Sequence, residues 1–195
     1  MKLTTLFGVV SAVLCGFLLT PTLLYASNSQ PVLDANAGVA ITQFNKAIAD
    51  YLALRNRLRS EVKGPVKNST STQVTDASDA LAGGIQRARS KAQPGAIFSP
   101  AVSTVIKKQI ADAIRTEKLA PVLADIDDEK SVALKPTVHL RLPVSAQMAT
   151  MPASLLKVLP TLPKELEYRI IGHYLVIRDV DASLILDYIP NAVAR

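Results

Sequence analysis

The 195-residue chain contains a single cysteine, no tryptophan and two histidines. Cys15 lies inside an apolar run near the N-terminus, so the rest of the chain offers no disulfide, catalytic thiol or thiolate metal ligand. The histidines, His139 and His173, are isolated and lack the close spacing of a typical zinc-binding pair. We therefore predict a fold that is stabilised by its hydrophobic core alone, with no cofactor and no bound metal.

Aromatic residues are also scarce, at 5% of the chain. Sugar-binding clefts and surfaces that stack nucleic-acid bases both depend on aromatic side chains, so their scarcity argues against both ligands. The chain has no Gly-x-Ser-x-Gly elbow and no glycine-rich phosphate loop. Ser154 and Lys157 have the spacing of a Ser–Lys dyad but lack its companion motifs. We predict that the protein is not an enzyme; the alternative is a small periplasmic hydrolase with an unrecognised site.

Apolar residues are concentrated at the N-terminus, where 17 of the first 26 residues are apolar and one lysine is the only charge. This pattern is typical of a secretory signal peptide, here residues 1–26, with cleavage after Ala26 or, alternatively, after Ser29. The run is also long enough to span a bilayer, so an uncleaved anchor is the other interpretation. Leu14, before Cys15, is too large for the site of a lipidated cysteine. We predict an exported protein, periplasmic or secreted, whose mature chain has no membrane span.

Apolar periodicity then predicts a helical region at 36–118, with helices at 36–62, 76–92 and 99–118. Asp76 is the expected N-cap of the second helix, and Gly83-Gly84 in its middle indicates close helix packing. Ser99-Pro100 is a strong start for the third helix, because serine caps well and proline fits the first helical position.

A proline-rich connecting region at 119–164 follows, divided into short pieces. Within it, Thr137–Leu142 alternates like a half-buried strand, and Ala153–Leu159 has room for two helical turns at most. The C-terminal part, 165–195, contains strand-like runs at 167–171, 174–178 and 184–189, with a tight turn at Gly172-His173. The predicted class is α+β, with about three helices followed by a small antiparallel β-meander.

Two resemblances accompany this pattern. The run from Leu162 to Asp187, with Arg87–Phe98, resembles a family of uncharacterised exported bacterial proteins. That likeness implies export and implies no activity. The C-terminal hairpin, with its Tyr-x-hydrophobic strand and glycine turn, is weakly similar to small periplasmic proteins of the nickel/cobalt-homeostasis type. Metal handling is therefore a further alternative, although no metal ligands carry over.

Positive charge is concentrated in the helical part, where residues 55–118 carry twelve Lys and Arg against five Asp and Glu. Export argues against nucleic acid as the partner of this charge. Anionic lipid, an anionic polymer or an acidic envelope protein is the expected partner, and a merely solvated helix surface is the alternative. The candidate basic binding surface consists of Arg55, Arg57, Arg59, Lys63, Arg87, Arg89, Lys91, Lys107 and Lys108.

Overall fold

The structure is a computed structural model that describes residues 30–62, 69–121, 123, 134–142 and 151–193. The predicted signal peptide lies outside these residues. The helices are α1 (Gln30–Glu61), α2 (Ser71–Ala88), α3 (Pro100–Thr116) and the short α5 (Ala153–Val158). The strands are β1 (Leu166–Ile171), β2 (Tyr174–Asp179) and β3 (Leu184–Ile189). The predicted α+β class, with three main helices before an antiparallel sheet, is confirmed.

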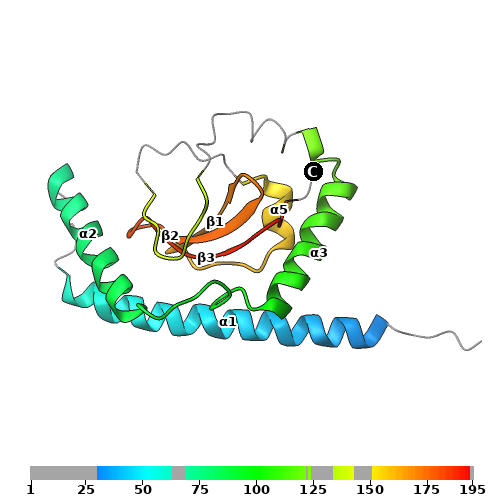
Figure 1. The fold of residues 1–195 in the computed structure, drawn as a ribbon, viewed down its shortest axis with the longest axis horizontal. Helices are drawn as coiled ribbons and strands as arrows, with labels where there is room; N and C mark the ends of the chain where they lie inside the picture. The colour runs from blue at the N-terminus through cyan, green and yellow to red at the C-terminus, as the bar shows by residue number, and fades with distance from the viewer. Residues whose placement is uncertain (1–29, 63–68, 122, 124–133, 143–150, 194–195) are drawn as a thin grey trace, which may run out of the picture.

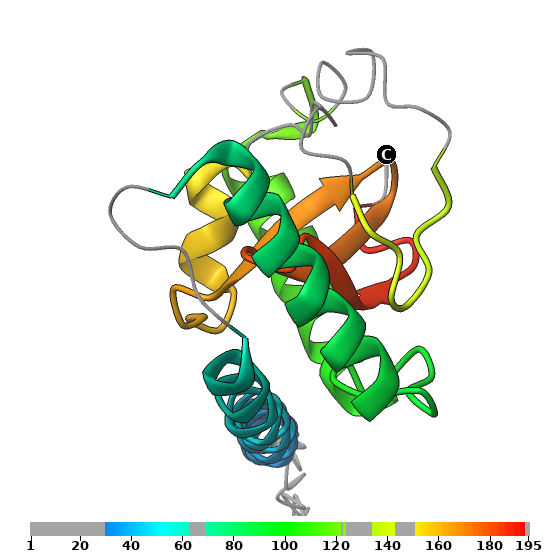
Figure 2. The same ribbon diagram turned by 90° about the vertical axis from the view of Figure 1, so that its left-hand side faces the viewer.

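The long helix α1 runs along one side of the molecule, below the sheet and the other helices in Figure 1. Its 32 residues correspond to about 48 Å at the usual rise per residue. Helix α2 meets α1 near its C-terminal end, α3 rises part-way along α1, whose N-terminal turns extend beyond it, and the sheet lies between α2 and α3 (Figures 1 and 2). The chain from α2 to α3 therefore has to run along the middle of α1.

The predicted start of the second helix was wrong. Helix α2 begins at Ser71, because Thr70 accepts a hydrogen bond from the Gln73 backbone while the Gln73 side chain bonds the Thr70 N–H. This reciprocal capping box satisfies two backbone donors and outweighs the weak apolar pattern before Asp76. The start of α3 was predicted correctly, since the Ser99 hydroxyl accepts from the Val102 N–H and Pro100 occupies the first turn.

The sheet is a meander with the order β1-β2-β3. Ile171 pairs with Tyr174, so Gly172 and His173 form the predicted two-residue turn between β1 and β2. Gly172 has φ +55°, a conformation that other residues adopt at a cost. A register shift at Ile177 and Arg178 interrupts the pairing of β2 with β3.

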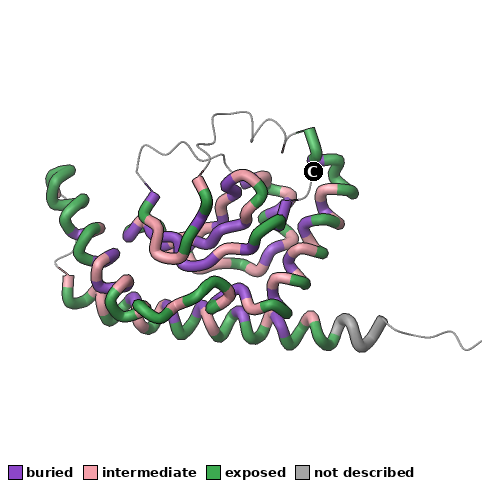
Figure 3. Tube along the Cα trace, in the orientation of Figure 1, coloured by how far each residue is buried: buried purple, intermediate pink, exposed green. Residues whose placement is uncertain are grey.

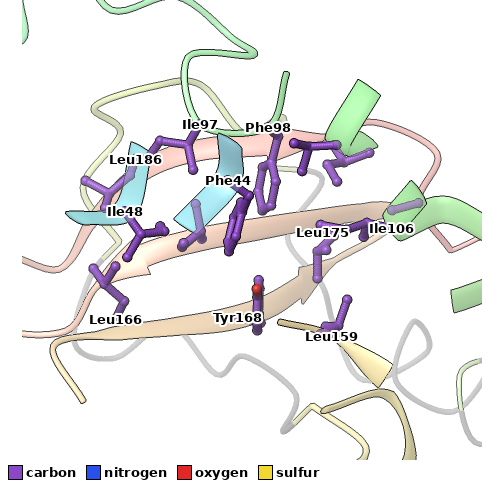
Figure 4. Close-up of a cluster of buried hydrophobic side chains, with 14 of the residues drawn as sticks. Phe44, Ile48, Ile97, Phe98, Ile106, Leu159, Leu166, Tyr168, Leu175 and Leu186 are labelled. Carbon is purple, nitrogen blue, oxygen red and sulfur yellow. The ribbon is translucent and has the colours of Figure 1, made fainter. Parts of the chain in front are cut away.

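One hydrophobic core joins the three main helices to one face of the sheet. Phe44 of α1 stacks on Phe98 at a ring-centroid distance of 5.8 Å, directly above the strands (Figure 4). Exposed residues lie mainly on the outer sides of the helices, and buried residues gather around the sheet (Figure 3). The helical part and the meander therefore share their buried surface.

Residues 134–142 run beside β3, and their leucine side chains pack on the other face of the sheet, but the strand predicted at Thr137–Leu142 was wrong. The segment turns at His139, whose φ is +70°, and makes one isolated bridge, between Arg141 and Leu184. The His139 N–H donates to the Ile185 carbonyl at 2.8 Å. Leu142 packs with Ile185 in a second, smaller apolar cluster, which explains the alternating pattern in the sequence.

Candidate functional site

The structure does not place the predicted basic residues on one common surface. They belong to α1, to the C-terminal end of α2 with the residues after it, and to α3, which stands on the other side of the sheet from α2 (Figure 1). Arg57, Arg87, Lys91 and Lys108 are exposed, and Arg59, Arg89 and Lys107 are half-buried. Lys108 bonds Asp112 at 2.9 Å on its own helix. Lys63 lies outside the described residues.

Arg55 does not belong to any exposed surface, because its side chain is 4% exposed. Its Nε donates to Asp179 Oδ2 at 2.6 Å and its terminal nitrogen donates to Asp181 Oδ2 at 2.6 Å. Burial alone would lower the pKa of Arg55, but the hydrogen bond and charge of Asp179 raise it. The Tyr51 hydroxyl also donates to Asp179, at 2.7 Å. Arg55 therefore connects α1 to the end of β2 and has a structural role.

A cavity of about 540 Å³, largely open to solvent, lies between the middle of α1 and the chain that connects α2 to α3. This is where the topology brings Arg89 and Lys91 close to α1. Six of the lining residues are aliphatic, and the others supply two cations, one carboxylate, a phenol and a hydroxyl. The lining residues are Ala47, Asp50, Tyr51, Leu54, Ala88, Arg89, Ser90, Lys91, Ala92, Ala96 and Ile97.

Arg89 is the distinctive residue of this cavity. Its guanidinium lies over the Tyr51 ring, 5.4 Å from the centroid, and both terminal nitrogens approach the Leu186 carbonyl at only 3.5 Å. In the part of the chain that the structure describes, Arg89 makes no ion pair. Burial lowers the pKa of Arg89, and Tyr51 and Asp187 only partly offset this. The cation is thus partly desolvated and has no bonded anion among the described residues.

Asp187 fixes the conformation of the α2–α3 connection beside Arg89. Its carboxylate is buried and accepts from the backbone N–H groups of Gly95, Ile97 and Phe98 at 2.9, 2.7 and 2.8 Å. Since its oxygens are used by the backbone, Asp187 offsets the charge of Arg89 without bonding it. Asp50 is the carboxylate that lines the cavity, and it pairs with the exposed Lys46 at 2.7 Å.

The other candidate residues lie elsewhere. Ser154 and Lys157 are on α5, where Lys157 is exposed, and neither lines the cavity. His173 is an exposed turn residue, as predicted. His139 is half-buried rather than on a surface. Its Nε2 is enclosed and has no hydrogen-bond partner among the described residues, and burial followed by the charge of Arg89 lowers its pKa. Among the described residues, no three His, Cys, Asp or Glu side chains gather as a metal site would require.

Sequence reasoning found Arg89 and Lys91 through their charge but missed their relation to Tyr51 and Asp187. Neither Tyr51 nor Asp187 was among the predicted site residues. The residues that these two side chains contact are distant in sequence. Tyr51 bonds Asp179, 128 residues away, and Asp187 bonds Ile97, 90 residues away. No local spacing could have indicated these pairs.

Comparison with family models, curated proteins and solved structures found no match for this chain. None of the helices in the described ranges combines the length and the hydropathy needed to cross a bilayer.

Proposed function

We propose that the protein is a non-catalytic binding protein that holds the carboxylate or phosphate group of a small ligand in the cavity between α1 and the α2–α3 connection. The observation that carries this is the half-buried guanidinium of Arg89, which lines the cavity and lacks an ion pair in the described structure. A desolvated guanidinium forms strong, paired hydrogen bonds with planar anions. Lys91 and the Ser90 hydroxyl offer further donors.

The cavity favours a compact ligand over a flat anionic surface. The basic residues are divided between α3 and the α1–α2 side of the molecule, so a membrane would meet only some of them. Inside the cavity the aliphatic lining would cover an apolar portion next to the anionic group. The single Asp50 carboxylate leaves the two cations in excess.

Titration with inorganic phosphate, followed by NMR at constant ionic strength, tests this. We expect localised shifts at residues 47–54 and 88–97. Arg89→Gln should weaken binding about tenfold or more, as the loss of a charged hydrogen bond does. Lys91→Gln should weaken it less, because Lys91 is exposed. Arg87→Gln is the matched control, two residues away and exposed.

Equal weakening by Arg87→Gln and Arg89→Gln would show that phosphate responds only to general surface charge, and would overturn the proposal. Binding to phosphatidylglycerol vesicles without any localised phosphate shift would favour the flat basic surface instead. If Arg89→Gln unfolds the protein, its NMR spectrum shows this directly. The effect of Lys91→Gln on phosphate binding then tests the proposal in its place.

Export from the cytoplasm is part of the same proposal. It is supported by the apolar first 26 residues and by the resemblance to exported bacterial proteins. The mass of the chain recovered from a bacterial periplasm identifies the processed N-terminus. Recovery of the unprocessed chain with the membrane fraction would support the uncleaved anchor.

A further inference from the structure

The border of the sheet formed by β1 is a second distinctive feature of the molecule. The strand order places β1 at an edge, and the strand that carries Leu166 and Tyr168 borders the sheet in Figure 4. No described residue pairs with its outer side as a strand. An edge strand presents unpaired main-chain groups that can bond another extended chain.

The hairpin register shows which main-chain groups face outward. Ile171 and Tyr174 flank a two-residue turn, and such flanking residues exchange both of their hydrogen bonds. Because hydrogen-bonded pairs alternate along an antiparallel ladder, the residues of β1 whose main-chain groups bond β2 are Ile171, Arg169 and Glu167. The next position confirms this, because the Glu165 carbonyl accepts from the Val180 N–H at 2.9 Å.

The intervening residues therefore turn their N–H and C=O groups away from β2. The Leu166 N–H is already bonded to the Pro163 carbonyl at 3.0 Å, which closes the start of the edge. Tyr168 and Ile170 have no such main-chain partner in the described residues. Both residues belong to the core and are 5% exposed, so their main-chain groups are held in a rigid strand.

The charged side chains at this edge indicate which charge a partner strand should carry. On the outer face of the sheet, Glu167 accepts from both Arg169 and Arg178, so two guanidiniums share one carboxylate. Arg169 belongs to the edge strand, and its Nε is enclosed and has no hydrogen-bond partner in the described part of the chain. A strand added beside β1 would place its side chains next to Arg169, at the usual cross-strand distance of about 5 Å.

We propose that the open edge of β1 binds an extended acidic segment of a protein partner, by main-chain hydrogen bonds to Tyr168 and Ile170 and a carboxylate on Arg169. Arg178 continues to hold Glu167 when Arg169 turns to the partner. A second copy of the chain fits less well, because pairing two such edges brings four guanidiniums together with two carboxylates. This inference is independent of the Arg89 cavity.

Amide hydrogen exchange, followed by NMR, tests the proposal on the intact chain. The probe is a blocked seven-residue peptide in which Glu alternates with Val, with a matched Lys–Val peptide for comparison. Without peptide, the Tyr168 and Ile170 amides should exchange quickly, while those of Glu167, Arg169 and Ile171 are protected. The Glu–Val peptide should protect Tyr168 and Ile170, and the Lys–Val peptide should not.

Arg169→Gln should weaken Glu–Val binding about tenfold, in line with the loss of one charged hydrogen bond, and Lys164→Gln is the exposed control nearby. Unchanged exchange at Tyr168 and Ile170 on adding peptide would overturn the proposal. Equal binding of the two peptides would overturn its acidic specificity. Protection of these amides without peptide, together with a dimeric mass, would identify a second copy as the occupant instead.

Discussion

At the scale of single residues, buried carboxylates carry the contacts that join distant segments. Asp187 holds the α2–α3 connection by three backbone N–H groups, and Asp179 receives Tyr51 and Arg55 from α1. Such groups contribute mainly by leaving no buried donor or charge unpaired, since an unpaired one is costly. This is why Arg55, which carries the same charge as its neighbour Arg57, has a different role.

Removal of Arg55 should therefore destabilise the protein far more than removal of Arg57. Arg55→Gln leaves the buried Asp179 without its charged partner, and we expect a loss of about 3 to 5 kcal/mol in the free energy of unfolding. Arg57→Gln, on the exposed side of the same helix, should change it by less than about 0.5 kcal/mol. Urea unfolding measures both. Similar values for the two variants would mean that the network with Asp179 and Asp181 contributes little.

At the scale of elements, regular periodicity made the helices and strands predictable, and local exceptions caused the errors. The start of α2 was misplaced because its first turn is exposed and held by a capping box rather than by apolar burial. The segment 137–142 alternates because it runs beside β3 with Leu140 and Leu142 packed on the sheet, yet the turn at its start limits its pairing to one isolated bridge. The cavity could not be predicted, since it depends on where α1 and the connection meet.

The glycines in α2 lead to a prediction about this element. Gly84 is buried, and an added Cβ would lie 3.5 Å from Leu58 Cδ2, an ordinary contact distance. Because alanine favours a helix over glycine by about 1 kcal/mol, Gly84→Ala should stabilise the protein by about 0.5 to 1 kcal/mol. Thermal unfolding measures the change. Gly172→Ala is the contrasting variant and should destabilise, because its φ of +55° strains alanine. A destabilised Gly84→Ala would show that α1 and α2 cannot accept even one methyl group.

At the scale of the whole molecule, the shared core argues for a single folding unit. The inner face of the sheet is covered by the helices, and Leu175, Ile177 and Leu186 are fully buried there. A meander of this size would expose these residues on its own, and three short strands need such cover for stability. Without the sheet, the helical part would likewise lack the surface against which Phe44 and Phe98 pack. The binding cavity and the β1 edge therefore depend on the same cooperative structure.

A substitution in α3 should consequently weaken β2 as much as α3 itself. Ile106 is fully buried in the shared core, and Ile106→Ala should lower the free energy of unfolding by about 2 to 5 kcal/mol. Hydrogen exchange of the slowest amides in α3 and in β2 would report that loss equally in both elements if they open together. A loss confined to α3 would show that the sheet keeps a stability of its own. Equal losses would mean that a ligand bound beside α1 also stabilises the sheet that carries the β1 edge, because any ligand of the folded state shifts the whole cooperative equilibrium.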